Sequence, residues 1–434
     1  MKCRSCLLVK RSILSSRPMS TKMTHSSVGI LADQTPREST DLAPERVSPA
    51  NEDTRLTGPG ARLSRRVSLI LCLCGIAVIA SVWRTNLVTL QGVHDFTGFF
   101  IGARLLGTPN LYDIPANLAM QKALTGYTLP NIIFVRPPFW AFVIKPFTFV
   151  DYHVALTVWK LMMFGALFAF SVSFSFVSTR YVALALCWSM PLANAFSTSN
   201  DAPLTLLFLG LSLAAWTKKK PVLSGIFLGL CLAKFHFLLF LPLLFLQRKY
   251  LRVMAGFCIP GLLAILVNFL VQPAWMSLYW KALNMPQENM NSAAGYMPNF
   301  YSAFFGTGHP GYGVALGILL ATIGLWTVTR RMPFELAMPL CIVGGVLVAP
   351  HTNNFDSILT IPAFLMVAQY HPALRFPAIL MLSPASGFLY IFGPAYWGSA
   401  AFVALSMWIV YRVGREQMTA PHIDGDNCGD KAYE

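Results

Sequence analysis

The residue best suited to acid–base chemistry is Asp95, in the segment 92–113, GVHDFTGFFIGARLLGTPNLYD. This segment follows the first long apolar run, and aromatic and small residues surround its carboxylates. A helix from Phe96 to Leu106 would place Phe99, Ala103 and Leu106 on one face, which predicts an amphipathic helix lying along a membrane surface. A carboxylate held there would suit a general base acting on a lipid-anchored substrate. The alternative is a helix cap beside an interfacial anchor.

Other polar side chains recur at the ends of later apolar runs. Ionisable groups near a membrane are functional candidates, because each costs about 3 kcal/mol to place there. Arg136 precedes a Pro-Pro pair, and Lys234 and His236 interrupt an apolar run. The other candidates are His94, Asn200, Asp201, Asn299, His351 and Asp356. Two plainer roles remain open: Asn200 with Asp201 can cap the following helix, and His351 with Asp356 can be a polar pair joining two helices.

The composition is that of a polytopic membrane protein. Hydrophobic residues make up 55% of the chain and charged residues 12%, whereas soluble domains carry about 25% charged residues. The mean hydropathy is +0.56. The formal charge of +15 does not indicate nucleic-acid binding, because Lys and Arg cluster between apolar runs, as the positive-inside bias predicts. Most of the nine cysteines lie inside apolar runs and the rest in the tails, so no disulfide framework is indicated.

The chain divides into a membrane domain and two polar tails. Residues 1–62 are rich in Ser, Thr, Pro and charge, which predicts a disordered cytosolic tail. Residues 63–415 form the membrane domain, and residues 416–434 form a second cytosolic tail. Arg65 and Arg66 precede the first span, which places the amino terminus in the cytosol and segment 92–113 outside.

The run Val222–Leu246 has basic residues at both ends, and both ends should therefore face the cytosol. Two short helices that turn at Lys234–His236 satisfy this requirement. A single long helix whose Lys234 pairs inside the bundle is the alternative. With the turn, polar residues from several loops gather on the outer side. The segment Phe134–Phe147 is broken by prolines and is not expected to be a simple crossing.

The order of these motifs resembles glycosyltransferase family 87. The matching motifs are D-x-x-x-F at Asp95–Phe99, G-x-x-x-LYD at Gly107–Asp113, the pair Pro137–Pro138, a glycine-rich hairpin at Gly225–Lys234, and H-x-x-x-x-D at His351–Asp356. The resemblance covers about residues 67–415. Two departures concern Val135–Arg136, where the family usually has an aromatic residue before the prolines, and Asn200–Asp201, where a Gly-Gln pair is common.

The resemblance implies the all-α polytopic membrane fold of C-type glycosyltransferases. About 11–13 membrane-spanning helices are expected, with an interfacial helix in the first outer loop. It also implies an inverting hexosyltransferase, and within that class a mannosyltransferase, of the cell (inner) membrane. This enzyme would move a sugar from a polyprenyl phosphate to a lipid or glycan acceptor at the outer face.

The roles implied by the resemblance are specific. Asp95 would be the base and His351 would orient it or the acceptor. The phosphate would be held by Lys234 with Arg136 or His236. Contacts to the acceptor or sugar would come from His94, Asn200, Asp201, Asn299 and Asp356. No metal and no other cofactor is expected.

Two other classes compete with this interpretation. A lipid-linked glycan transporter or flippase would also have broken helices and buried charge. However, the charged residues here collect at one face and no inverted repeat is evident. A glycan ligase would differ mainly in its acceptor. Neither a Walker A nor a Rossmann motif is present, so a nucleotide-sugar donor is not indicated.

Overall fold

The computed structural model describes residues 65–90, 94–130, 132–284, 295, 297–349, 351–384 and 395–419. Every regular element in these ranges is a helix, which confirms the all-α prediction. The tail predicted at 1–62 lies outside the described residues, as does the part of the second tail from residue 420. The last helix continues to Thr419, four residues beyond the predicted end of the membrane domain.

The helices follow one another with short connections. In chain order they are α1 (Arg65–Leu90), α2 (Asp95–Leu105), α3 (Ile114–Thr125), α4 (Pro138–Ile144), η2 (Lys145–Phe149), α5 (Tyr152–Ser173), α6 (Thr179–Cys187), α7 (Met190–Ser197), α8 (Ala202–Thr217), α9 (Pro221–Gly229), η3 (Leu230–Leu238), α10 (Leu241–Phe245), η4 (Arg248–Tyr250), α11 (Leu251–Val271), α12 (Trp275–Leu283), α14 (Phe300–Ala303), η6 (Phe305–Thr307), α15 (Pro310–Arg331), α16 (Phe334–Val348), η7 (Asn354–Thr360), α17 (Ile361–Tyr370), η8 (Pro372–Leu374), α18 (Arg375–Leu382) and α20 (Ala395–Thr419).

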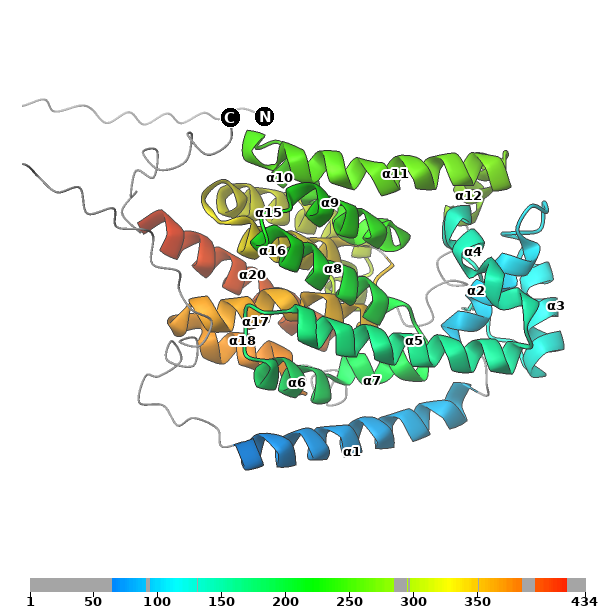
Figure 1. Cartoon of the computed structure of the whole chain (residues 1–434), viewed down its shortest axis with the longest axis horizontal. Coiled ribbons are helices and arrows are strands. Elements are labelled where there is room, and N and C mark those ends of the chain that lie inside the picture. Colours follow the sequence, from blue (N-terminus) through cyan, green and yellow to red (C-terminus); the bar gives the residue numbers. More distant parts are fainter. Residues whose placement is uncertain are drawn as a thin grey trace, which may run out of the picture. The chain divides into compact units, whose positions relative to one another are not determined.

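Four of these helices pack in a row, in the order α11, α9, α8 and α5 (Figure 1). Helix α8 runs antiparallel to α9, because the hydroxyls of Ser212 and Ser224 lie 3.0 Å apart while Thr205 contacts Cys231. Small residues allow close approach at the α9–α11 contact. A Cβ on Gly225 would lie 2.0 Å from the carbonyl oxygen of Val253.

The chain reverses at Lys234, as the basic flanks predicted. Gly225 contacts Val253 and Gly229 contacts Phe257, so α9 and α11 run parallel and the residues between them must turn back. Lys234 has non-helical angles, φ −120° and ψ 50°, at the break inside η3. The hairpin prediction is therefore confirmed. Because α8 is antiparallel to α9, the amino terminus of α8 lies beside this turn.

Helix α16 forms the centre of the core, with fourteen of its fifteen residues buried. By contrast, α11 buries only Val253, Gly256 and Asn268 and leaves a broad apolar face exposed. An exposed apolar surface of this kind is suited to contact with lipid. Four helical segments are long and apolar enough to cross a membrane: Tyr152–Ser173, Pro221–Leu238, Arg248–Val271 and Pro310–Arg331. With the shorter apolar helices, they make this a polytopic helical membrane protein, while the expected count of 11–13 spans stays a prediction.

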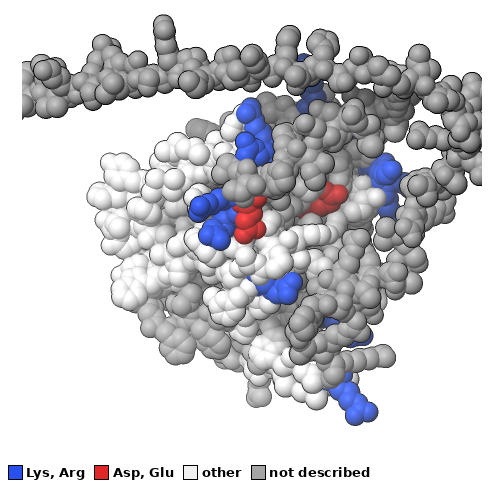
Figure 2. All heavy atoms as spheres, turned by 90° about the vertical axis from the view of Figure 1, so that its left-hand side faces the viewer, with Lys and Arg blue, Asp and Glu red and all other residues white. Residues whose placement is uncertain are grey.

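The basic clusters meet at one end of this bundle. The amide of Gln247 donates to the carbonyl of Thr329 at 2.9 Å, and the hydroxyl of Tyr250 donates to the carbonyl of Met332. Trp216, next to the Lys218–Lys220 cluster, makes an edge-to-face contact with the ring of Tyr250. Figure 2 views the molecule from the left-hand side of Figure 1, and Lys and Arg side chains outnumber Asp and Glu on this face. The bundle therefore has a basic end, as a cytosolic face requires.

Two expectations about the first half of the chain have different outcomes. The segment Phe134–Phe147 does not cross the bundle, because its only α-helix there, α4, has seven residues. The expected helix in segment 92–113 exists as α2, but it is not amphipathic, since nine of its eleven residues are buried. Other helices, chiefly α3, α4 and η2, pack against α2. The surface-lying helix was thus a wrong prediction for this part of the chain.

Candidate active site

A cavity of about 660 Å³ lies at the end opposite the basic clusters. Its polar wall combines residues from five places in the sequence that were predicted to share one face. These residues are Asp95, Arg136, Asn200, Lys234, His236, His351, Asn353 and Asp356. Its remaining wall is apolar and includes Phe235, Leu239, Val314 and Ile318.

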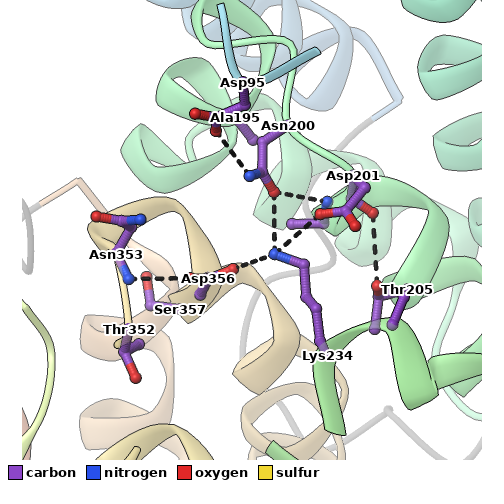
Figure 3. Close-up of polar contacts among 12 residues, drawn as sticks. Asp95, Ala195, Asn200, Asp201, Thr205, Lys234, Thr352, Asn353, Asp356 and Ser357 are labelled. Atoms are coloured by element: carbon purple, nitrogen blue, oxygen red, sulfur yellow. Dashed lines mark hydrogen bonds and ion pairs between the residues drawn. The ribbon is translucent and has the colours of Figure 1, made fainter. Parts of the chain in front are cut away.

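Lys234 is the centre of the polar contacts (Figure 3). Its Nζ lies 2.5 Å from Asp356 Oδ1, 3.1 Å from Asp201 Oδ1 and 3.0 Å from Asn200 Oδ1. An ammonium group has three protons to donate, and these three oxygens account for all of them. Lys234 is also only 1% exposed. Its charge is therefore already matched inside the protein, as the alternative interpretation of Lys234 expected, and its contact with a phosphate stays a prediction.

Asn200 joins Lys234 to Asp95. Its Oδ1 accepts from both Lys234 Nζ and the backbone N–H of Ala202, the latter at 2.8 Å. The Nδ2 of Asn200 then donates to Asp95 Oδ2 at 2.8 Å. Asn200 thus satisfies the first backbone N–H of α8, whose N-cap residue is Asp201, and also contacts the candidate base. A structural role at the start of α8 and a role in the site are therefore compatible.

The loop 197–201 fixes the amino terminus of α2. The backbone N–H of Asp95 donates to the carbonyl of Thr198 at 2.7 Å, and His94 Nδ1 lies 2.9 Å from the carbonyl oxygen of Ser197. Ser199 takes a left-handed conformation, φ 54°, and its carbonyl accepts from Trp159 Nε1. These bonds hold the Asp95 backbone against the loop that carries Asn200.

Arg136 is the second cation that pairs with Asp201, beside Lys234. Its Nη2 is 3.2 Å from Asp201 Oδ1 and its Nη1 donates to the carbonyl of Ala233 at 2.5 Å. The hydroxyl of Tyr112, from the LYD motif, donates to the Arg136 carbonyl at 2.8 Å. Arg136 keeps 13% side-chain exposure and lines the cavity, so it can reach a ligand more readily than Lys234.

The cluster leaves one carboxylate without a cationic partner. Lys234 and Arg136 match the charges of Asp201 and Asp356, whereas the only hydrogen bond to the Asp95 carboxylate among the described residues is from Asn200. Burial raises the pKa of Asp95 to about 6, against the lowering effects of the Asn200 hydrogen bond and the Lys234 charge. A carboxylate with this pKa is ionised at neutral pH and more basic than an ordinary aspartate, as a general base requires.

The two cavity histidines differ in their surroundings. His236 Nε2 is buried and has no hydrogen-bond partner among the described residues. Burial lowers the pKa of His351, so its imidazole is neutral at pH 7. Both can form neutral hydrogen bonds to a bound ligand.

Three predicted contact residues do not line the cavity. His94 caps the start of α2, and Asn299 is fully buried, where it donates to the carbonyl of Ala349 and caps α14. Asp201 lies behind Lys234 and Arg136. All three make contacts within the protein, and their contact with an acceptor or sugar stays a prediction.

Two parts of the site had no role assigned from the sequence. Asn353, in the polar stretch HTNNFD, lines the cavity, and its backbone N–H donates to Asp356 Oδ2 at 2.9 Å. The apolar wall residues Leu239 and Ile318 carried no signal, because each is one apolar residue among many in its helix.

The fold and the cavity define a multi-pass membrane protein with a cavity lined by carboxylates, cations and histidines at one end of its helical bundle. The model of glycosyltransferase family 87 matches residues 134–350, half of the chain, and the protein belongs to this family. It is therefore a membrane glycosyltransferase. Arg136, Asn200, Lys234 and His236 lie within the matched residues, whereas Asp95 precedes them and His351 follows them. No curated protein and no solved structure matched the chain.

Proposed function

We propose that this protein is an inverting hexosyltransferase, most simply a mannosyltransferase, that takes its sugar from a polyprenyl phosphate. The observation that carries the proposal is a cavity that joins an ionised cluster, including one unpaired carboxylate, to an apolar wall. The acceptor is a lipid or glycan hydroxyl. The site faces outward from the cell membrane, with both termini in the cytosol.

The reaction needs one base and a stabilised leaving group. Asp95 takes the proton from the acceptor hydroxyl as that oxygen attacks the anomeric carbon. The bond between the anomeric carbon and the phosphate oxygen breaks, and the polyprenyl phosphate leaves with the electron pair. Attack opposite the leaving group inverts the anomeric configuration. His351, on the same cavity wall, orients the acceptor or Asp95.

The geometry favours Arg136 and His236 as the direct phosphate contacts. The Arg136 guanidinium is partly exposed to the cavity, and guanidinium groups bind phosphate oxygens with two parallel hydrogen bonds. His236 has an Nε2 with no partner among the described residues. Lys234 supports the phosphate through its charge, since its protons are directed at protein oxygens.

The apolar wall provides a path for the lipid chain. Three residues line the cavity and are also exposed: Phe235 of η3 at 42%, Leu239 directly after η3 at 51%, and Ile318 of α15 at 42%. Helix α15 packs against α10 and α16 near Leu325, but η3 and α15 have no extensive contact. A long isoprenoid chain fits such an opening because the charged head stays in the cavity while the chain lies against apolar side chains.

Donor dependence tests this proposal. Membranes containing the protein should transfer labelled sugar from a polyprenyl-phosphate hexose to an endogenous acceptor. They should not do so from a sugar nucleotide when synthesis of the polyprenyl-linked sugar is blocked. Transfer from the nucleotide sugar alone under that block would contradict the proposed donor. The glycan ligase remains the alternative, and transfer of a preassembled glycan in place of a single hexose would favour it.

A further inference from the structure

We propose that Asn200 and Lys234 form a positioning relay that sets the orientation and basicity of Asp95. In this relay Lys234 fixes the side-chain amide of Asn200, and Asn200 presents one N–H to Asp95. This inference rests on the proposed function, in which Asp95 is the base. It assigns Lys234 and Asn200 to the support of the base instead of to contact with phosphate or sugar.

The amide of Asn200 has only one orientation that satisfies its neighbours. Its Oδ1 faces two donors, Lys234 Nζ at 3.0 Å and Ala202 N at 2.8 Å. A rotated amide would direct its NH₂ group at both donors and leave them unsatisfied, which is costly at this buried position. Nδ2 is therefore directed at Asp95 Oδ2, and Asp95 Oδ1 remains for the acceptor proton.

Lys234 is held in turn by two carboxylates on different elements. Asp356 belongs to η7, and its second oxygen accepts from the backbone of Asn353. Asp201 precedes α8 and also pairs with Arg136. The relay thus links α2, α8, η3 and η7 through side chains in contact. Its last residue, Asp356, is held by the backbone N–H of Asn353.

Several charged or titratable groups lie around Asp95 and affect its proton affinity. These groups are Arg136, Asp201, Lys234, His236, His351 and Asp356. An N–H donor and a nearby cation favour the ionised carboxylate, whereas a nearby carboxylate disfavours it. Removing the Asn200 donor or the Lys234 charge should therefore raise the pKa of Asp95, and neutralising Asp356 should lower it.

The test is the acid limb of the pH profile of kcat/KM in matched variants. Asn200→Ala, and Asn200→Asp, which keeps the shape but loses the donor, should move the limb upward by about one pH unit. Lys234→Met should also move it upward. In this variant each carboxylate keeps a partner, Arg136 for Asp201 and the Asn353 backbone for Asp356. Asp356→Asn should move the limb downward.

The control is Asn117→Ala, which removes another buried asparagine whose side-chain bonds go to backbone groups away from Asp95. It should leave the limb where it is. If the Asn200 variants lower activity equally at every pH and leave the limb unmoved, Asn200 is only structural and the relay is refuted. Shifts of the same sign in Asp356→Asn and Lys234→Met would also refute it.

A readout without substrate separates this inference from the proposed function. For each variant, the pH dependence of thermal unfolding is measured with Asp95 present and again with Asp95→Asn added. The difference between the two reports the titration of Asp95. Shifts in that titration with no transfer from any polyprenyl-phosphate sugar would overturn the function and uphold the relay. Normal transfer with an unshifted titration would overturn the relay alone.

Discussion

Lys234 Nζ and Asp356 Oδ1 lie 2.5 Å apart although 122 residues separate them in the chain. Both side chains are almost inaccessible to solvent, with exposed fractions of 1% and 4%. Breaking such a buried pair by removing one partner is expected to cost about 3–5 kcal/mol when nothing else compensates. The pair therefore locks η3 to η7 and places the polar residues of both segments on one wall of the cavity.

The first prediction concerns Asp95 as the base. Asp95→Asn keeps the shape but cannot accept a proton, so sugar transfer should fall by roughly 100-fold or more. The control is Asp113→Asn. Asp113 caps α3 through the backbone N–H of Ala116, and Asn caps a helix nearly as well. Transfer is measured with a labelled polyprenyl-phosphate hexose and normalised to protein amount. Near-normal transfer by Asp95→Asn would exclude it as the base.

The second prediction is a pH dependence. Because the pKa of Asp95 is about 6, the ionised base is lost as the pH falls through 6, and kcat/KM should drop about tenfold per unit below it. The same shift has a stability consequence with the opposite trend. The folded state holds this proton more tightly than the unfolded chain, whose pKa is near 3.8, so the contribution of Asp95 to stability declines as the pH rises through this window. Thermal unfolding of Asp95→Asn should lack that decline. An acid limb near pH 4 would contradict the raised pKa.

The third prediction locates the lipid chain. Ile318 and Leu319 are neighbours on α15 with exposures of 42% and 56%, but only Ile318 lines the cavity. Ile318→Trp should obstruct the opening and raise the apparent KM for a long polyprenyl-phosphate donor by about tenfold, while a donor with a ten-carbon chain is affected less. Leu319→Trp is the matched control and should leave both unchanged. If both tryptophan variants raise the apparent KM equally, or if both donors are affected equally, the lipid chain of the donor does not lie at Ile318.

The fourth prediction concerns orientation in the membrane. Asn110, in the loop after α2, and Lys218, after α8, are both exposed. They lie at opposite ends of the bundle, since Gln272 after α11 bonds the loop at Gly107 and Thr108. In intact cells, Asn110→Cys should react with an impermeant thiol reagent and Lys218→Cys should not, with the parent chain as background. The reverse labelling would invert the topology and place the site in the cytosol.

The fifth prediction tests the hairpin that carries Lys234. A Cβ at Gly225 would lie 2.0 Å from the Val253 carbonyl, whereas a Cβ at Gly165 would meet nothing within 4 Å. Gly225→Ala should therefore destabilise the protein by about 1–3 kcal/mol through overpacking. Gly165→Ala should be neutral or slightly stabilising, because alanine favours a helix more than glycine does. The two are compared by thermal unfolding in detergent. An unchanged midpoint for Gly225→Ala would mean that α9 and α11 are not packed as closely as described.

The sequence by itself determined the class and much of the chain's course. Composition required a membrane bundle, and the basic residues on both sides of Val222–Leu246 required a reversal, which is found at Lys234. Such charge patterns can be interpreted from the sequence alone, because each basic cluster favours the cytosolic side of the membrane independently of its neighbours. The same charge pattern predicted that five polar residues lie at one end of the bundle, and all five line the cavity: Asp95, Arg136, Asn200, Lys234 and His351.

The tertiary structure decided which partner each of these residues has. From the sequence, Lys234 was assigned to phosphate binding, with pairing inside the bundle as the alternative, and the helix Phe96–Leu106 was expected at the membrane surface. In the folded protein, Lys234 donates to three protein oxygens and α2 is enclosed by other helices. The physical reason is that a buried charge must be paired and a buried donor satisfied, and the partners come from α8 and η7, far along the chain. Distances between such segments are set only when all the helices have packed.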